Sequence, residues 1–303
     1  MIINMFRDMI NDFIMVAKKN PLYIVCTIIY FIIGVRLFDG GITGFLIMFI
    51  FYYMSFFIAF TTFGELILRL LEGIRSIETN KEYDYLFPIF EEVYEEAKKK
   101  HPDLEDIEMC IIDKMTVNAC SLGKYTVAVS KGAIATFSED ELKAIIAHEI
   151  AHIANYDAMA RVYITVGNGF FTFVLIMLRL FSFIVRTVQD VAEVSKPAKF
   201  FVNVISFLVE AIILIILFLA QATTSIGSRK NEYRADKFAY ELGYGNEMLS
   251  ALYLLEEIQL GDNSNLIQKM VANHPRITKR IYELEEVMEE KVTEYDEYDN
   301  EDT

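Results

Sequence analysis

The stretch His148-Glu149-Ile150-Ala151-His152 decides how this chain must fold, because it has the residue types and spacing of a zinc hydrolase centre. On an α-helix, residues four apart lie one turn above each other on the same face. His148 and His152 can therefore each give one nitrogen to a single Zn²⁺, while Glu149 is placed to take a proton from metal-bound water. The alternative is a pair of core or surface histidines, but a glutamate inserted at this spacing favours the metal.

The residues around this motif predict the helix that it needs. Ser138 and Glu141 have the pattern of a capping box, in which two side chains satisfy backbone groups at a helix start. An apolar stripe at helical spacing follows, made of Leu142, Ile145, Ile146 and Ile150. We therefore expect a helix that begins near Ser138 and carries both histidines on one face.

A catalytic zinc site needs a third protein ligand and an open fourth position. The best candidate is Glu232, in the segment Asn231-Glu232-Tyr233-Arg234-Ala235-Asp236. Asp236 lies one helical turn further on and can accept the outer N–H of a ligand histidine, which fixes its tautomer. The alternative is an exposed helix end in which Glu232, Arg234 and Asp236 form surface ion pairs.

The composition indicates a membrane protein. The 303 residues could form one large domain or two ordinary ones, and with 54% hydrophobic residues the mean hydropathy is +0.31. Four apolar stretches cause this value, namely Leu22–Val35, Ile42–Phe63, Val162–Leu178 and Phe200–Ala220. Each is long enough, or nearly so, to cross about 30 Å of hydrocarbon as a helix, so we predict four transmembrane helices. For Val162–Leu178 a buried core helix is the alternative, because this stretch is short.

Both ends of the chain differ from this pattern. Residues 1–20 place apolar and polar side chains on opposite faces, which predicts an amphipathic helix in the membrane interface rather than a cleaved signal peptide. Residues 283–303 hold eleven acids and one lysine, hence ten of the net fifteen negative charges, and their end is expected to be disordered.

The sequence contains no basic stripe that would indicate a nucleic-acid partner. Cys26, Cys110 and Cys120 form no CxxC pair, so neither a disulfide scaffold nor a thiolate metal site is expected.

Between the second and third predicted spans, the pattern indicates a small α+β domain. Ile107–Ile112, Thr116–Cys120 and Thr126–Ser130 are short and rich in β-branched residues, which predicts a small sheet beside the motif helix. Helices are expected over Glu65–Glu78, continuing the second span, and from Pro88 to Lys99. The fold class is therefore a mainly α membrane protein with four transmembrane helices and a zincin-like α+β domain.

The order of these segments predicts where the site lies. An even number of crossings keeps the motif and Glu232 on one side of the membrane, and the Lys/Arg bias favours the cytoplasm. Glu210, inside the fourth predicted span, is expected to face protein or a water-lined interior. The expected parts are an interfacial helix (1–20), two transmembrane helices (21–63), the first part of the catalytic domain (64–160), two further transmembrane helices (161–221), the second part of the domain (222–290) and an acidic tail (291–303).

These residues resemble the HtpX-type membrane zinc metalloproteases, which are relatives of the CAAX prenyl proteases. The likeness covers both pairs of predicted membrane helices and the catalytic region. It is carried by His148–His152 with Ala154-Asn155-Tyr156-Asp157, by Asn231–Asp236, by Val117-Asn118-Ala119-Cys120, and by Asn273-His274-Pro275-Arg276.

The resemblance implies a role for several residues. The zinc ligands would be His148, His152 and Glu232, and the general base would be Glu149. Asn118, Ala119 and Cys120 would form the edge strand that pairs with an extended substrate. Cys120 and Ser121 depart from the residues that usually follow the Asn-Ala pair, which leaves the strand's preference open. His274 would either stabilise a transition state or belong to a structural cap beside Pro275. The implied substrates are unfolded or damaged membrane proteins, in quality control at the cell membrane.

Three other functions fit parts of the sequence. A CAAX prenyl-protein endopeptidase would enclose its zinc in a chamber of more membrane helices than the four predicted. A catalytically silent zinc-containing membrane scaffold should lack Glu149 or close the fourth coordination position with Cys or His. A transporter is disfavoured, because the two pairs of spans show no repeat of each other.

Overall fold

The computed structural model describes residues 2–38, 40–163, 165, 177, 180, 183–185, 187–188, 196–261 and 277–301. It divides into two compact units. The first contains Met1–Pro21, Phe57–Val162 and Ser225–Thr303, and the second contains Leu22–Phe56 and Tyr163–Thr224. The catalytic motif and Glu232 both belong to the first unit.

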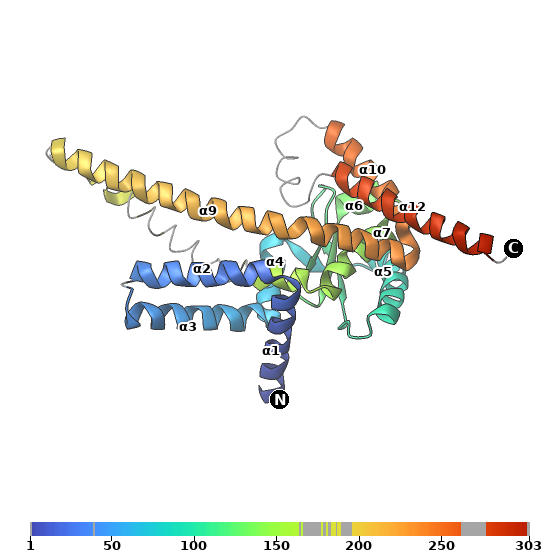
Figure 1. Cartoon of the computed structure of the whole chain (residues 1–303), viewed down its shortest axis with the longest axis horizontal. Coiled ribbons are helices and arrows are strands. Elements are labelled where there is room, and N and C mark those ends of the chain that lie inside the picture. Colours follow the sequence, from blue (N-terminus) through green and yellow to red (C-terminus); the bar gives the residue numbers. More distant parts are fainter. Residues whose placement is uncertain are drawn as a thin grey trace. The chain divides into compact units, whose positions relative to one another are not determined.

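Helices dominate both units (Figure 1). The described elements are α1 (Ile2–Lys19), α2 (Pro21–Phe38), α3 (Ile42–Ala59), α4 (Thr62–Glu72), β1 (Ile74–Ser76), α5 (Asn80–Lys100), β2 (Glu108–Ile112), β3 (Ala119–Leu122), β4 (Thr126–Ser130), α6 (Lys131–Thr136), α7 (Glu139–Ala154), α9 (Lys196–Ala239), the π-helix η1 (Tyr240–Tyr244), α10 (Gly245–Gly261) and α12 (Ile277–Glu301). Residues 157–163 are also helical. The predicted mainly α architecture with a small sheet is confirmed.

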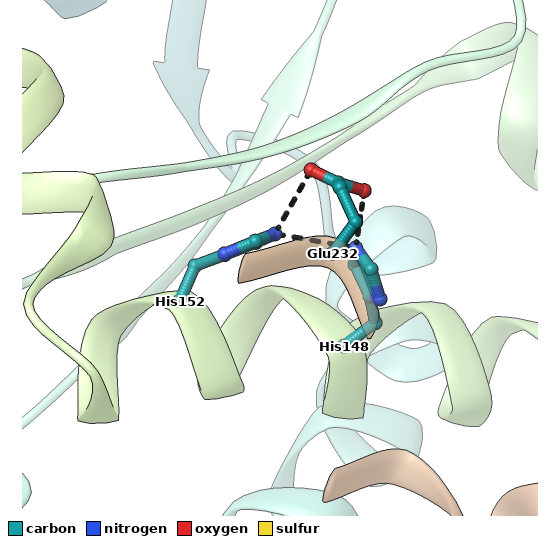
Figure 2. Close-up of side chains that lie close together, drawn as sticks. All are labelled: His148, His152 and Glu232. Atoms are coloured by element: carbon teal, nitrogen blue, oxygen red, sulfur yellow. Dashed lines mark hydrogen bonds and ion pairs between the residues drawn. The ribbon is translucent and has the colours of Figure 1, made fainter. Parts of the chain in front are cut away.

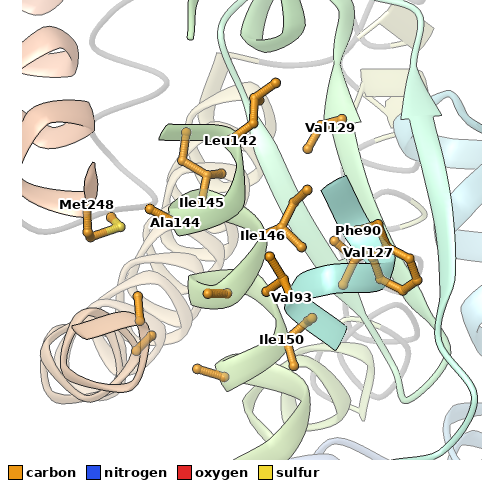
Figure 3. Packing of buried hydrophobic residues seen from close by; sticks show 14 of the residues in the cluster. Phe90, Val93, Val127, Val129, Leu142, Ala144, Ile145, Ile146, Ile150 and Met248 are labelled. Carbon is orange, nitrogen blue, oxygen red and sulfur yellow. The ribbon is translucent and has the colours of Figure 1, made fainter. Parts of the chain in front are cut away.

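The sheet of the first unit is mixed and has the strand order β1-β2-β4-β3. Strands β2 and β4 pair in parallel at its centre, and β1 and β3 pair antiparallel at its two edges. Every residue of β4 is buried, as expected for a central strand covered on both faces. Figure 3 shows side chains of β4, α5 and α7 packed together in the core beside this sheet. The motif helix is therefore held by an apolar core and not by the metal alone.

Strand β4 has the predicted bounds, and β2 lies within its predicted range, but β3 is shifted towards the C-terminus. The prediction placed this strand at Thr116–Cys120, whereas pairing begins at Ala119 and continues to Leu122. Asn118 instead bonds to Ser130 through both its backbone groups, at 2.9 and 3.0 Å. The β-branched residues Thr116 and Val117, which precede Asn118, caused the strand to be predicted too early in the sequence.

The predicted helix Glu65–Glu78 ends early. Gly73 adopts a left-handed conformation with φ of 72°, which terminates α4 and turns the chain into β1. The predicted start of the next helix at Pro88 was also wrong, because Thr79 and Glu82 form a capping box that begins α5 at Asn80. The proline lies inside this helix.

Within the described residues, one helix, Ile42–Ala59, is long and apolar enough to cross a membrane. The segments Thr27–Arg36 and Lys199–Leu208 are shorter apolar helices. Most of the third predicted span lies outside the described residues, and Glu210 belongs to α9, where it is half-buried. Four spans and the six-part organisation thus stay predictions.

Arg75 joins three elements of the first unit. From β1 it binds Glu82 at the start of α5 (2.7 Å) and Asp113 just after β2 (2.6 Å). Hydrogen bonds from Arg75 are the main cause that lowers the pKa of both carboxyls to about 2. Because both pKa values are lowered by folding, the two ion pairs stabilise the fold at a pH above the ordinary pKa values of 4.5 and 3.8. This stabilisation is lost as the pH falls towards 2.

We expect Arg75→Gln to lower the thermal unfolding midpoint of the detergent-solubilised protein at pH 7, because Glu82 loses its ion-pair partner and Asp113 keeps only Lys131. The difference from wild type should shrink steadily between pH 4.5 and pH 2. Lys81→Gln, which removes an equal charge from an exposed site, is the control. An Arg75→Gln deficit that is unchanged at low pH would show that the ion pairs do not carry the effect.

Candidate metal centre

Helix α7 carries the motif in the predicted manner. The Ser138 hydroxyl accepts a hydrogen bond from the backbone N–H of Glu141 (3.3 Å), and the Glu141 carboxylate accepts one from the N–H of Ser138 (2.9 Å). From Leu142 to Ala154 almost every side chain is buried. The helix is thus fixed at its start by the cap and along its length by the core, so its histidines have little freedom to move.

Helix α9 delivers the third candidate ligand. It runs without a break from Lys196 to Ala239, so the fourth predicted span and the Glu232 segment form one continuous helix. Glu232 and Asp236 lie one turn apart on it, and they are only 1% and 2% exposed. The alternative of an exposed, charged helix end is therefore wrong.

Figure 2 shows that His148, His152 and Glu232 point towards one another. The two Nε2 atoms lie 3.2 Å apart, and the Glu232 oxygens lie 3.4 Å from Nε2 of His148 and 3.6 Å from Nε2 of His152. Corners of a tetrahedron with zinc–ligand bonds of about 2.1 Å are roughly 3.4 Å apart. These three donors therefore fit one zinc ion, with a fourth corner left for another ligand.

The outer nitrogen of each histidine faces a carboxylate. Nδ1 of His148 lies 2.9 Å from Asp236, and Nδ1 of His152 lies 3.2 Å from Asp157. An ionised carboxylate only accepts hydrogen bonds, so in a metal-bound site each Nδ1 would carry the proton and each Nε2 would present its lone pair to the ion. The contact of Asp236 was predicted, whereas that of Asp157 was not.

A left-handed residue brings Asp157 into place. Tyr156 has a φ of 61°, which is uncommon for a residue with a large side chain and reverses the chain just after α7. Asp157 also accepts hydrogen bonds from Arg234 (2.9 and 3.0 Å) and from Asn20 at the end of α1 (3.3 Å). Asn231 donates to Asn20 (3.2 Å) and so closes this buried network. The carboxylate behind His152 is therefore held from three separate segments of the chain.

Arg280 of α12 is the main residue that the sequence did not predict. It is 4% exposed, binds both oxygens of Asp236 at 2.8 and 2.5 Å, and lies 3.1 Å from Glu232. In the sequence it follows Asn273-His274-Pro275-Arg276 by four residues, but nothing in the sequence alone distinguishes it from Arg276. His274 itself lies outside the described residues.

The charges of the pocket favour a cation. Glu149, Asp157, Glu232 and Asp236 are all buried, and among the described residues Arg234 pairs with Asp157 and Arg280 with both Glu232 and Asp236. Burial and Arg280 on their own would lower the pKa of His148, but its hydrogen bonds with Asp236 and Glu232 outweigh them and raise the pKa to about 9. The surroundings thus stabilise positive charge at the histidines, which is the charge that a divalent ion would supply there.

Strand β3 runs beside α7 at the level of the motif. The Ser121 hydroxyl donates a hydrogen bond to Glu149 at 3.0 Å, and both residues are buried. The predicted substrate residues lie just before it, with Ala119 and Cys120 in the edge strand and Asn118 at its start. All three are partly exposed. The site therefore combines a metal-ligand set, an adjacent carboxylate and an accessible strand edge.

Comparison with known proteins places this site in a family. The model of "Peptidase family M48" matches residues 80–288, which is more than half of the chain and includes every residue of the pocket except Asn20. The chain belongs to peptidase family M48. Membership supports a membrane metalloprotease in general.

Its M48 relatives include proteins named HtpX. The "Protease HtpX homolog" of Dictyoglomus turgidum is 26% identical over 299 residues, which cover 88% of this chain and 92% of that protein. The "Protease HtpX" of Pseudomonas fluorescens Pf-5 is 32% identical over 65% of this chain and 69% of that protein. The match to the Nitrosomonas eutropha homolog, at 30% identity, spans 64% of that relative's length. The predicted recognition of an HtpX-type M48 member is confirmed.

A solved structure shares the fold. The crystal structure of S. mikatae Ste24p has a TM-score of 0.50 and 21% sequence identity, with 92% of this chain and 65% of that chain covered. At this identity the likeness shows the fold alone. It agrees with the M48 assignment reached from the sequence.

We expect Glu232→Ala to lower the zinc affinity of this M48 protein by more than about 100-fold, because even the loss of an outer hydrogen-bond partner costs roughly 10- to 100-fold. Competition with a fluorescent chelator measures the affinity. Glu241→Ala, at an exposed position nine residues further on, should bind zinc like the wild type. Equal zinc content in the folded Glu232→Ala protein would place the third ligand elsewhere.

Proposed function

We propose that this protein is a membrane-integrated zinc metalloendopeptidase that hydrolyses peptide bonds in unfolded or damaged proteins, including membrane proteins. The observation that carries the proposal is the set of three donor atoms 3.2–3.6 Å apart, with Glu149 next to His148 on the same helix. Family membership makes a metallopeptidase the expected chemistry. The fit of this donor set to tetrahedral coordination favours zinc as its metal.

The side chains of the pocket divide the work of hydrolysis. His148, His152 and Glu232 would hold the ion, and Asp236 and Asp157 would keep the two imidazoles in the ligating tautomer. When bound, zinc polarises the scissile carbonyl and lowers the pKa of water to about 7. Glu149 takes the proton from the attacking water and hands it to the leaving amine. This is peptide hydrolysis without a covalent enzyme intermediate.

Ser121 supports the base in this scheme. Its hydroxyl donates to one carboxylate oxygen of Glu149 at 3.0 Å, so one side of the carboxylate is held and the other oxygen is left for water. Both side chains are buried, which limits alternative orientations of the carboxylate. Ser121 is a positioning residue, because it acts through Glu149 and not on the substrate.

The edge strand suggests the form of the substrate. Within the part of the chain that the structure describes, strand β3 pairs with β4 and lies at the edge of the sheet, and an extended peptide can add to such an edge through backbone hydrogen bonds. Asn118, Ala119 and Cys120 would line this addition. A folded substrate has few extended segments free to pair, so unfolded or locally disordered chains are the expected substrates. Membrane-protein quality control at the cell membrane, with a cytoplasmic active site, is the role that agrees with this preference.

Two other functions can be separated from this one by experiment. A prenyl-protein endopeptidase would cut farnesylated CAAX peptides and leave unmodified unfolded chains intact. A silent scaffold would bind zinc and cut neither. The presence of Glu149, hydrogen-bonded and beside the ligands, supports an enzyme over a scaffold.

We expect Glu149→Gln to retain zinc and to lose casein cleavage by roughly 10²- to 10⁴-fold, the usual contribution of a general acid–base. Glutamine keeps the shape of the side chain but cannot accept the proton. Glu139→Gln, at an exposed position of the same helix, is the matched control and should cut at the wild-type rate. Cleavage by a zinc-loaded Glu149→Gln protein at the control rate would remove Glu149 as the base.

We expect Ser121→Ala to lower kcat by about tenfold, because the loss of one hydrogen bond to a charged group costs roughly 1.5–3 kcal/mol and other contacts hold part of the orientation. KM for an extended peptide should stay close to the wild-type value, because β3 retains its backbone. A change in KM alone, at equal zinc content, would mean that Ser121 shapes the strand and does not orient the base.

A further inference from the structure

Helix α4 has its polar side inside the protein and its apolar side outside. Glu65 and Leu68 are each 6% exposed, and Arg69 is largely covered. Four large apolar side chains of α4 point outward and form one stripe, namely Phe63 (56% exposed), Leu66 (50%), Leu70 (73%) and Leu71 (73%). A helix on a water-facing surface has the opposite arrangement, so this stripe requires an apolar environment.

The inward groups of α4 leave no freedom to rotate this stripe into the core. The Glu65 carboxylate accepts a hydrogen bond from the hydroxyl of Thr126 at the start of β4. Arg69 donates to the same hydroxyl (2.7 Å) and binds Glu108 of β2 (2.7 Å). Rotation of α4 would break this buried set and expose a charged pair to the apolar side. The outward direction of the four large side chains is thus fixed by polar contacts.

The chain before α4 identifies what covers the stripe. Helix α3, the described helix that can cross a membrane, ends at Ala59, and α4 begins at Thr62. Three Cα–Cα steps of 3.8 Å allow at most about 11 Å between these two residues. A Cβ on Gly64 would lie 2.5 Å from the carbonyl oxygen of Ile58, so α4 starts in direct contact with the end of α3. The stripe therefore begins where the span leaves the hydrocarbon.

We propose that α4 is a lipid-binding helix that lies in the membrane interface, with Phe63, Leu66, Leu70 and Leu71 among the lipid acyl chains. Interfacial helices bury an apolar face several ångströms into the boundary of the acyl chains. Here the polar face that such helices usually turn to water is instead bonded to the sheet. Protein is another apolar occupant, for example a second copy of this chain, and the experiment below distinguishes it from lipid.

The contacts of α4 connect the bilayer to the edge strand. Thr126, which Glu65 and Arg69 both contact, pairs with Leu122 at the end of β3. The lipid-bound helix thereby holds β3 at a fixed height above the membrane, where segments that protrude from the bilayer can reach it. This consequence for substrates rests on the proposed function, whereas the lipid contact of α4 does not.

The chain contains no tryptophan, so Leu70→Trp gives the protein a single indole on the stripe. The full-length variant is reconstituted into phosphatidylcholine vesicles with or without bromine on the acyl chains. We expect a blue-shifted emission that loses most of its intensity in the brominated vesicles. Tyr282→Trp, which places the single indole at a 65% exposed position on α12, should show red-shifted emission and little quenching. Leu71→Trp repeats the test if Leu70→Trp fails to fold by circular dichroism.

Three results would overturn the proposal. Red-shifted, unquenched emission from position 70 would place the stripe in water. Blue-shifted emission without quenching would place it against protein, as in a dimer. Equal quenching of the indoles at positions 70 and 282 would show that the acyl chains do not contact α4 in preference to an exposed site on α12. None of these readings depends on peptidase activity, so a failure here leaves the proposed function standing, and loss of activity leaves this proposal standing.

Discussion

A cluster of four buried carboxylates, close to α7, α9 and α12, is the constraint on which the rest of the catalytic unit depends. Glu149, Asp157, Glu232 and Asp236 meet there, and among the described residues Arg234 binds Asp157 and Arg280 binds Glu232 and Asp236. Buried charge of this kind is strongly destabilising unless it is paired or coordinates a metal. The pocket is therefore a structure that a divalent cation completes, and its stability and its chemistry are set by the same groups.

The fold meets this constraint by bringing distant segments to one point. The capping box at Ser138 and the core behind α7 fix the two histidines, and the unbroken helix α9 fixes Glu232 and Asp236. Arg280 arrives from α12, and Asn20 from the end of α1. This arrangement explains how two imidazoles can be held ready for a metal in a small, mostly helical unit.

The sequence allowed much of the site to be predicted, because its strongest signals are local. His148, Glu149 and His152 are specified by one helical turn, and the same spacing rule relates Asp236 to Glu232. Arg280, Asp157, Asn20 and Ser121 were missed as partners, since each depends on long-range packing that periodicity does not report. The sequence shows several acids close to the histidines, but it does not show that they are buried together or that Arg280 is the arginine that binds them. Strand β1 was missed for a different reason: a single glycine ended α4 and three residues then paired with β2.

The central claim is that two histidines and one glutamate hold a single zinc ion without sulfur. X-ray absorption at the zinc edge, on the purified wild-type protein loaded with one equivalent, tests it directly. The account predicts a first shell of nitrogen and oxygen at about 2.0–2.2 Å, with an imidazole scattering pattern for two histidines. A sulfur shell at about 2.3 Å, which Cys120 would have to provide, or a spectrum that lacks imidazole scattering, would contradict it.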